Sequence, residues 1–438
     1  MKKMENKNFI NFKKEHNFMK EIFLPYGKEK ISITIPQKNL LKICLLKETP
    51  GVKDNAKAIK DAIKNPIGSP TIPKIAQGKR TAVVICTDIT RPTPDHLLIP
   101  PILDELNKGE ISDKNIKVII ARGQHRKMTE EEVKEKVGEE VFKRVKISQH
   151  DPDNNLFYLG KSKKGNELWM NKDVAQADVK ISTGNIIPHR YAGYGGGAKS
   201  ILPGISSRET IGHNHLYVET GEAALGKTKG NPVREEMEEA AKMIGLDMIV
   251  NTVMNVKNEI VEVIAGDPAI AHQAGVKACN NIYGVKIPEK ANIIIASSFP
   301  MDATFYQASK ALEAVEHIIK EKSTIVMLSS CYEGIGSKDF LNFLKEKTPE
   351  DIIKSIKAHK ERSVVAGVIS YLIAKCKEKA KIYLISEGIQ DKDVREMGML
   401  PAKSAQSVIN DVLKKYGDEA KVLVLPTASI TLPLLEEE

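Results

Sequence analysis

Short runs of β-branched and other apolar residues recur along this chain, and stretches with the periodicity of amphipathic helices separate them. Uninterrupted apolar runs are typical of parallel strands that are buried on both faces. The alternation of the two patterns predicts an α/β fold with largely parallel sheets and right-handed crossovers. We expect strands at 81–87, 116–121, 179–183, 293–297, 324–328, 381–386 and 422–426, and helices at 232–244, 302–320 and 363–379.

A chain of 438 residues is too long for one ordinary hydrophobic core, so two domains are expected. A long helix candidate ends near residues 281–290, and a new series of strands begins after it. We therefore predict an N-terminal α/β domain over 1–285 and a second α/β domain that begins at 286.

The composition is that of a soluble globular protein, with 41% hydrophobic and 28% charged residues. The formal net charge is +9, but lysines alternate with glutamates, as in 131–146, which is typical of a solvated surface. With 5% aromatic residues and a single tryptophan, Trp169, the chain offers few platforms for stacking bases. We expect no nucleic-acid partner, and a mild positive field that favours an anionic substrate.

The five cysteines are scattered and form no CxxC pair, which fits a reducing compartment and argues against a zinc site built on cysteine. No apolar stretch is long enough to span a membrane, and segment 1–20 lacks the apolar run of a signal peptide. The sequence therefore predicts a cytoplasmic protein with no membrane partner.

The segment CTDITRPTPDH (86–96) follows directly after a predicted strand. Asp88 and Thr90 are hydrogen-bonding groups, and Arg91 offers a fork that matches carboxylate or phosphate oxygens. Functional residues gather at such strand ends in α/β sheets. The TPD sequence alone would also fit an ordinary helix N-terminus.

A second polar segment, ARGQHRKMTEEE (121–132), follows the next predicted strand. Thr129 and Glu132 have the spacing of a capping box, so this part is structural. His125 lies just before it, at the strand end, where both a structural and a catalytic role are open.

The segment with the most candidate groups is STGNIIPHRYAGYGGGAKSILPGISSRETIGHNH (182–215). Its clustered glycines carry a large backbone-entropy cost, which indicates that the backbone approaches a ligand closely. Two of its histidines are two residues apart, but no carboxylate or cysteine nearby completes a zinc site. One of them is better explained as a single ligand to a metal that something else already holds. The basic residues concerned are His189, Lys199, His213 and His215.

A phosphate-binding P-loop is the main alternative for part of this segment. Residues 193–200 read GYGGGAKS, with Ala198 where the GxxxxGK[ST] pattern requires glycine. A P-loop also opens a helix at its lysine, whereas Pro203 and Gly204 follow soon after Lys199. A nucleotide-binding phosphotransferase or ATPase that uses 193–200 is therefore the alternative function.

A fourth candidate segment, 299–317, follows the first strand of the second domain. Tyr306, Gln307 and Lys310 open its predicted helix. Gln307 and Lys310 are three residues apart and share a helix face, where an amide and an ammonium group can hold a carboxylate. Without further context, the same residues also fit the exposed face of an ordinary helix.

Together, the four segments resemble the nickel-dependent lactate racemase family. The resemblance runs in order from LPYGKEKISITIP (24–36) past Lys310, and PHRYAGYGGGAKSILPGISSRETIGHNH is its most specific part. It implies two α/β domains with the active site in the cleft between them. It further implies that the C-terminal domain covers 286–404 and that 405–438 returns to the N-terminal domain.

The activity implied by the resemblance is racemisation or epimerisation of a 2-hydroxy acid, with lactate as the first candidate. Loss of a proton from Cα beside a carboxylate gives a costly carbanion, whereas loss of hydride gives a planar 2-keto acid but requires a cofactor. The family's cofactor is a nickel-pincer nucleotide, pyridinium-3,5-bisthiocarboxylic acid mononucleotide. Lys199 would attach covalently to one arm, and His215 would be the protein ligand of nickel, which suits a sulfur-rich set.

The other roles implied by the resemblance divide between acid/base, cofactor and substrate groups. His125 and His189 would be the acid/base pair for the substrate hydroxyl. The residues expected at the cofactor are Asp88, Thr90, Arg91, Tyr191, Gly195 and Gly196, and those expected at the substrate are Arg91, Tyr306, Gln307 and Lys310.

Three features bear on substrate and partners. Arg190 follows His189 where an uncharged residue is expected, and an extra cation there would favour a second carboxylate or a polyol chain. The tryptophan that the family can place near the lactate side chain has no counterpart, and Tyr371 is the candidate in its place. Accessory proteins that make the cofactor are implied partners, and a non-catalytic carrier of the cofactor is a third interpretation.

Overall fold

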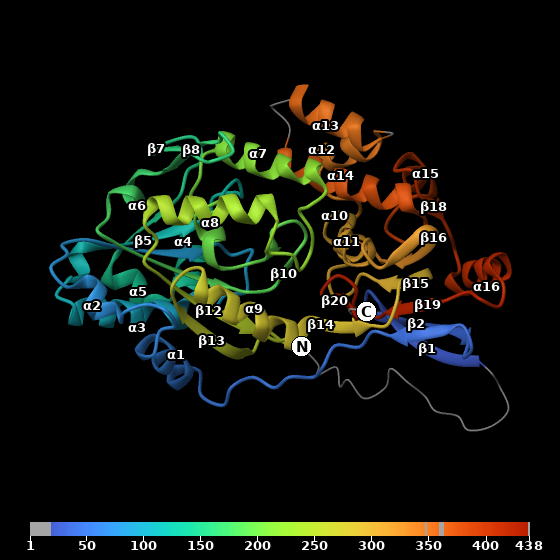
Figure 1. Cartoon of the computed structure of the whole chain (residues 1–438), viewed down its shortest axis with the longest axis horizontal. Coiled ribbons are helices and arrows are strands. Elements are labelled where there is room, and N and C mark those ends of the chain that lie inside the picture. The colour runs from blue at the N-terminus through green and yellow to red at the C-terminus, as the bar shows by residue number, and fades with distance from the viewer. Residues whose placement is uncertain (1–18, 347, 359–362, 437–438) are drawn as a thin grey trace. The chain divides into compact units, whose positions relative to one another are not determined.

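The structure is a computed structural model that describes residues 19–346, 348–358 and 363–436. The chain divides into two compact units (Figure 1). One unit is Lys47–Ile282, and the other combines the described residues up to Leu46 with those from Tyr283 onward. No helix among the described residues is both long and apolar enough to cross a membrane.

The sheet of the Lys47–Ile282 unit has six strands in the order β13-β12-β9-β4-β5-β6. All neighbours are parallel except β12 and β13. Successive strands β4, β5 and β6 run outward in one direction, and β9 lies on the other side of β4, so strand order reverses between β4 and β9. The strands are β4 (Ala82–Thr87), β5 (Ile116–Ala121), β6 (Lys146–Gln149), β9 (Val179–Asn185), β12 (Met248–Met254) and β13 (Ile260–Gly266).

Five helices pack on one face of this sheet and share its core with alternate strand residues, among them Val84, Val118 and Ile181. These helices are α1 (Asn55–Lys64), α2 (Ile72–Ala76), α3 (Asp95–Lys108), α4 (Glu130–Val137) and α5 (Glu139–Arg144). The predicted capping box is present, because Thr129 and Glu132 each accept a hydrogen bond from the other's backbone N–H. The unit also contains β7 (Leu156–Lys161), β8 (Glu167–Asn171), α6 (Lys172–Gln176), β10 (Pro188–His189), β11 (Gly193–Tyr194), η3 (Gly197–Ser200), α7 (Arg208–Leu216), η4 (Tyr217–Thr220), α8 (Pro232–Ile244) and α9 (Ile270–Tyr283).

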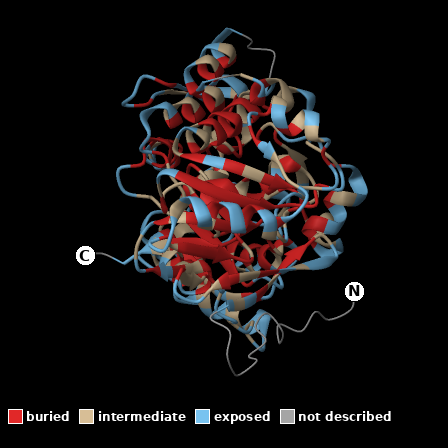
Figure 2. Cartoon of the chain, turned by 90° about the vertical axis from the view of Figure 1, so that its right-hand side faces the viewer, coloured by how far each residue is buried: buried red, intermediate tan, exposed pale blue. Residues whose placement is uncertain are grey.

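The sheet of the other unit is entirely parallel, in the order β18-β17-β16-β15-β19-β3. The hairpin of β1 and β2 and helix α16 share one core with it. Figure 2 shows that the central strands are mostly buried and that exposed residues lie mainly on turns and outer helix faces. Its strands are β1 (Met19–Tyr26), β2 (Glu29–Pro36), β3 (Leu40–Ile43), β14 (Gly284–Ile287), β15 (Ala291–Ser297), β16 (Ile319–Leu328), β17 (Ala380–Ile385), β18 (Leu400–Pro401), β19 (Val422–Leu425) and β20 (Leu432–Leu435). Its helices are α10 (Phe305–Ala308), α11 (Lys310–Val315), α12 (Lys338–Leu344), α13 (Pro349–Ala358), α14 (Val364–Lys379), α15 (Asp391–Glu396) and α16 (Ala405–Tyr416).

The expected fold class, α/β with largely parallel sheets, is confirmed, but the chain is divided differently from the prediction. Segment 405–438 was expected to return to the N-terminal domain, whereas β19 lies between β15 and β3 in the sheet of the second unit. The parallel pairing of Leu40 with Val422 joins two distant parts of the chain, which no local pattern encodes. The predicted helix 302–320 was also wrong in part, because it breaks at Ser309 and β16 begins at Ile319.

A buried ion pair fixes the start of α3, directly after the loop that follows β4. Lys136 Nζ lies 3.1 Å from Asp95 Oδ2 and also donates to the carbonyl oxygens of Arg91 and Thr93. Asp95 is fully buried and accepts a second hydrogen bond from the Thr87 hydroxyl. Each buried charge therefore has polar partners inside the core. Lys136 also anchors the loop 88–94 through the carbonyl groups of Arg91 and Thr93.

Lys136→Met should lower the stability of the Lys47–Ile282 unit by about 3–5 kcal/mol, because it leaves the Asp95 carboxylate buried without its cation. Urea denaturation followed by a probe in this unit measures the change. The control is Lys134→Met, which removes an exposed ion pair with Glu139 from the same helix and should leave the midpoint unchanged. Equal midpoints for the two variants would contradict the role given to the buried pair.

Candidate functional site

Several candidate residues of the Lys47–Ile282 unit lie in loops at the carboxyl ends of the parallel strands of its sheet. The loops after β4, β5 and β9 leave the carboxyl ends of neighbouring parallel strands. Strand order reverses between β4 and β9, and such a switch point is where open α/β sheets bind ligands. The sequence predicted the strand ends but not which strands are neighbours.

Asp88 and His125 form a hydrogen-bonded pair across two of these loops. His125 Nδ1 lies 2.5 Å from Asp88 Oδ2, and Asp88 Oδ1 accepts from the Thr90 hydroxyl at 2.5 Å and from the Thr90 backbone N–H. Because the carboxylate accepts, Nδ1 carries a proton, so in the neutral form of the ring Nε2 is the nitrogen with the lone pair. The His125 side chain is 46% exposed, so Nε2 can meet a ligand.

The Asp88 carboxyl is held in its ionised form. Burial alone would raise its pKa, but hydrogen bonds from His125 and Thr90 and the charge of Arg91 lower it. Arg91 Nη1 donates to the Thr90 hydroxyl at 3.2 Å. The predicted group of Asp88, Thr90, Arg91 and His125 is therefore brought together.

A row of three rings follows β9. Tyr191 is buried, and its ring centroid lies 4.8 Å from that of His189 and 5.0 Å from that of His215. His189 is half-buried, and its Nδ1 accepts a hydrogen bond from the Ala192 backbone N–H at 3.3 Å. Neutral His189 therefore carries its proton on Nε2, the opposite arrangement to His125.

Lys199 lies in the short helix η3 and its side chain is half-buried. Loss of hydration, followed by the charges of Arg91 and Arg234, lowers the pKa of its ammonium group to about 7. A large share of Lys199 is therefore a neutral, nucleophilic amine near neutral pH.

His215 and His213 lie on helix α7 and have different environments. His215 is 2% exposed, and burial together with the charge of Lys199 lowers its pKa to about 3. It is thus neutral at physiological pH, and its Nδ1 has no hydrogen-bond partner among the described residues. His213 is exposed and lines a surface hollow of about 500 Å³ with Trp169 and Glu209. A joint His-x-His metal site is therefore not formed.

The glycines after β9 are explained by packing within the fold. A Cβ atom on Gly193 would lie 2.1 Å from the Lys227 carbonyl oxygen, and one on Gly197 would lie 2.7 Å from the His272 ring. Gly196 has a φ of +69° and a Cβ there would meet Asn251 Oδ1 at 2.6 Å. These contacts require glycine at the three positions, so the backbone-entropy cost of the glycines does not by itself indicate a ligand. Contact of Gly195 and Gly196 with a cofactor stays a prediction.

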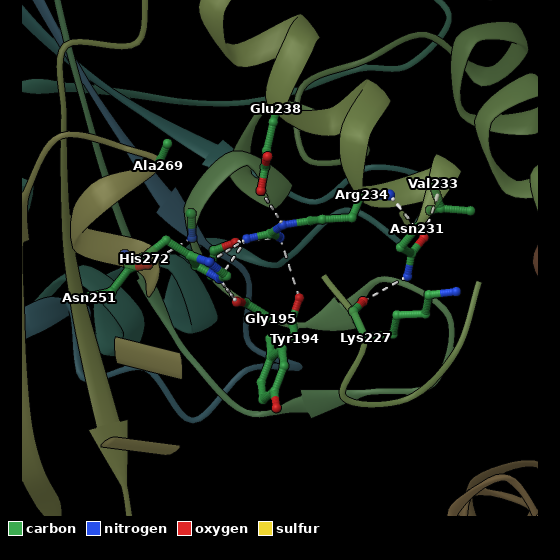
Figure 3. Close-up of polar contacts among 12 residues, drawn as sticks. Tyr194, Gly195, Lys227, Asn231, Val233, Arg234, Glu238, Asn251, Ala269 and His272 are labelled. Carbon is green, nitrogen blue, oxygen red and sulfur yellow. Dashed lines mark hydrogen bonds and ion pairs between the residues drawn. The ribbon is translucent and has the colours of Figure 1, made fainter. Parts of the chain in front are cut away.

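Two residues beneath this loop were missed by sequence reasoning. Arg234 and His272 are both buried and together contact the carbonyl groups of residues 194–196 (Figure 3). Arg234 lies in an amphipathic helix that the sequence predicted correctly, where an arginine is ordinarily a surface residue. The signal in the sequence is that Arg234 falls on the helix face that carries the apolar residues of α8.

Tyr306, Gln307 and Lys310 lie in the other unit, after β15. Strand order reverses between β15 and β19, so this loop also leaves a switch point. Ser309 has helical backbone angles, so Gln307 and Lys310 remain one helical turn apart as predicted. Gln307 is exposed, Lys310 is half-buried, and the Tyr306 ring packs edge-on against Phe340 at 5.0 Å.

The groups present suit a ligand that brings its own metal donors. Among the residues that the structure describes, no three histidine, cysteine, aspartate or glutamate side chains form a group that could hold a metal ion. A neutral imidazole with an unsatisfied nitrogen, next to a neutral amine, provides one metal ligand and one point of attachment. Arg91 adds a cation for an anionic group.

In the metal-free protein, His215→Leu should reduce the loss of stability at acid pH. The folded pKa of His215 is about 3 and the ordinary value is 6.5, so the unfolded chain takes up a proton first and the stability contribution is lost as pH falls below about 6.5. Between about pH 7.5 and pH 5, the variant should lose about 2 kcal/mol less than the unaltered protein, measured by urea denaturation. The control, His213→Leu, should keep the original pH dependence, and a His215→Leu curve parallel to it would show that His215 is not buried in neutral form.

Comparison with known proteins gives concordant results. The sequence model of the lactate racemase N-terminal domain matches residues 26–226, and that of the lactate racemase C-terminal domain matches 286–431. The lactate racemase of Thermoanaerobacterium thermosaccharolyticum is 32% identical over 419 residues, covering 93% of this chain and 98% of that protein. The lactate racemase of Lactiplantibacillus plantarum is 30% identical over 418 residues, with the same shares covered.

Solved structures agree. The lactate racemase apoprotein from Thermoanaerobacterium thermosaccharolyticum superimposes with a TM-score of 0.85 at 30% identity, covering 95% of this chain and 100% of that one. A protein from Thermotoga maritima shares the fold, with a TM-score of 0.63 at 16% identity, covering 89% of this chain and 100% of that one. Because curated relatives match at this level over nearly their whole length, the chain belongs to the lactate racemase family.

Proposed function

We propose that this protein interconverts the two stereoisomers of a 2-hydroxy acid, with lactate as the first candidate substrate, by reversible hydride transfer to a nickel-pincer nucleotide. The observation that carries the proposal is the set of groups at the β4/β9 switch point. It combines two histidines with opposite proton arrangements, a buried neutral imidazole and a lysine whose pKa is about 7. The same set lies in a chain whose relatives are named lactate racemases.

In this proposal, Lys199 and His215 hold the cofactor. Lys199 supplies a neutral amine for covalent attachment, and His215 supplies a neutral imidazole as the one protein ligand of nickel. When bound, the cofactor supplies the hydride acceptor that no side chain provides. Asp88, Thr90 and Arg91 are proposed to lie at its phosphate and ribose end or beside the substrate.

The two histidines divide the proton transfer at the substrate hydroxyl. His125 Nε2, with its lone pair free, accepts the hydroxyl proton, and Asp88 fixes the ring and its tautomer. His189 acts as the acid in its imidazolium form and donates a proton to the oxygen when hydrogen returns to the other face of the 2-keto acid. It then becomes the neutral ring whose Nδ1 accepts from the Ala192 backbone N–H. After one turnover His125 carries the extra proton and His189 is neutral, so the two rings have exchanged states and suit the opposite enantiomer.

Substrate binding is proposed to involve Arg91, Tyr306, Gln307 and Lys310. A guanidinium or ammonium group beside an amide holds a carboxylate while the keto acid turns. Tyr371 is buried in α14 and is the proposed neighbour of the substrate side chain, and Arg190 is the candidate for recognising a larger acid.

The phosphotransferase alternative is less well supported. After β9, the chain forms β10 and β11 before the glycine-rich loop, and residues 197–200 form only the short helix η3. A P-loop instead passes from its strand straight into a helix whose N-terminal N–H groups hold phosphate. Residues 193–200 have neither arrangement.

The proposal includes partners and a compartment. Cofactor-synthesising accessory proteins are required, because nothing in the described residues builds the pincer. A cytoplasmic location is proposed because Cys44, Cys86, Cys279, Cys331 and Cys376 are all unpaired and buried.

The function is tested by co-producing the protein with pincer-synthesising enzymes and nickel, and then offering single enantiomers of lactate, 2-hydroxybutyrate, malate, 2-hydroxyglutarate and gluconate. We expect nickel-dependent formation of the opposite stereoisomer of at least one acid, detected by chiral chromatography. Lys199→Ala should abolish the intact-mass increase of the bound pincer, and His215→Ala should lose nickel. His213→Ala is the matched control on the same helix and should keep both.

Protein that gains neither nickel nor mass under these conditions would refute the cofactor assignment. Protein that gains both but isomerises none of the five acids would refute the substrate assignment alone.

A further inference from the structure

Arg234 is a fully buried cation beneath the loop that leads to Lys199. It lies in the first turn of α8 with 1% of its surface exposed. Its Nη1 donates to the carbonyl oxygens of Tyr194 and Gly196 at 3.4 Å, and its Nε donates to Glu238 Oε1 at 3.0 Å (Figure 3). The guanidinium group thus contacts the loop and, one turn further along its own helix, Glu238.

His272 extends this contact to the residue in between. Its Nε2 lies 2.8 Å from the Gly195 carbonyl oxygen, which can only accept, so Nε2 carries the proton. Arg234 Nη2 lies 2.7 Å from its Nδ1 and 2.6 Å from its Nε2, so the guanidinium group packs directly against the ring. Three successive carbonyl groups, at residues 194–196, are therefore held by Arg234 directly or through His272.

This loop has little regular structure of its own to hold it. Gly193, Gly196 and Gly197 have positive φ angles, and the strands β10 and β11 that pair beside them have two residues each. Gly197 N–H also donates to Asn251 Oδ1 at 2.7 Å. Gly197 packs directly on the His272 ring, and Lys199 follows two residues later. The position of the Lys199 backbone therefore depends on what holds residues 194–197.

The charge of Arg234 is only partly balanced. Among the residues that the structure describes, its carboxylate partner is Glu238, whose side chain is 44% exposed. The remaining positive charge acts on the loop and, after loss of hydration and Arg91, contributes to the lowered pKa of Lys199.

We propose that Arg234 is a positioning residue which, with His272 as a relay, fixes the backbone of residues 194–196 and so places the Lys199 amine for attachment of the cofactor. The inference rests on the proposed function, in which Lys199 carries the cofactor. It assigns to this pair no contact with substrate or cofactor.

The test uses the full-length protein without cofactor. A small amine-acylating reagent is applied between about pH 6 and pH 10, and acylation of Lys199 is quantified by peptide mass spectrometry. Lys377, a half-buried lysine of the other unit that donates to the Met397 carbonyl, is the internal reference. Hydrogen exchange of peptides covering 193–204 reports the order of the loop in the same samples.

Arg234→Met should raise the midpoint of Lys199 acylation by about one pH unit and speed exchange of the loop amides by about tenfold or more, with Lys377 unaffected. Arg234→Lys keeps the charge but not the fork, so it should speed exchange while the midpoint stays near that of the unaltered protein. A loop exchange rate and a Lys199 profile that do not change in Arg234→Met would overturn the proposal.

The relay is tested with a conservative pair. His272→Gln keeps one donor and one acceptor and should preserve slow loop exchange, whereas His272→Leu removes both and should match the Arg234 variants. If Arg234→Met does not fold, the two His272 variants provide the test. Equal rates of loop hydrogen exchange in His272→Gln and His272→Leu would overturn the relay. None of these measurements uses cofactor or substrate, so their outcome does not depend on whether the proposed function is correct.

Discussion

The site depends on positive charge that the protein does not itself neutralise. Arg91, Lys199 and Arg234 lie close enough for the two guanidinium groups to lower the pKa of the lysine. Asp88, whose pKa the charge of Arg91 lowers, also accepts hydrogen bonds from His125 and Thr90. Glu238, the ion-pair partner of Arg234, is 44% exposed, so these carboxylates balance the positive charge only in part. Such an arrangement is costly in a low-dielectric interior unless one cation gives up its proton or an anion binds.

Loss of a proton from one cation and binding of an anion both fit the proposed chemistry. Release of a proton from Lys199 produces the amine that covalent attachment requires, and the same neighbourhood keeps His215 neutral for a metal. A mononucleotide with a phosphate and thiocarboxyl groups would bring the missing negative charge. Burial is the largest cause of both lowered pKa values, and positive charge adds to each, from Arg91 and Arg234 at Lys199 and from Lys199 at His215. The buried Arg234 guanidinium group that contributes at Lys199 also holds the loop.

Much of the fold was predictable because local patterns dictate it. The seven expected strands are present, and helix 232–244 and the capping box of Thr129 and Glu132 appear where expected. What local patterns do not encode is pairing between distant segments, such as β3 with β19. The early end of the helix predicted over 302–320 also follows from tertiary structure, since α11 ends at Val315 and Ile319 pairs with Ala291 in the sheet.

The candidate site was predictable to a different degree. Residue types at strand ends, together with the family resemblance, predicted Asp88, His125, His189, Lys199 and His215 as site residues, and all lie in one unit. Asp88 contacts His125, and the Tyr191 ring lies against the rings of both His189 and His215. The glycines alone do not distinguish the two explanations, because backbone that approaches a ligand and backbone that approaches a neighbouring strand or helix require the same residue. Arg234, His272 and the pair of Asp95 and Lys136 were missed because a buried charge is recognisable only once its partners are known.

The central claim is that the Cα hydrogen moves as hydride while His125 and His189 handle only the hydroxyl proton. The most direct measurement is conversion of one lactate enantiomer by the cofactor-loaded protein in D₂O, with the product analysed by mass spectrometry and proton NMR. The account predicts that the opposite enantiomer forms with ordinary hydrogen retained at Cα. Product that carries deuterium at Cα would contradict it, because it would show that a side chain removes and replaces that hydrogen as an exchangeable proton.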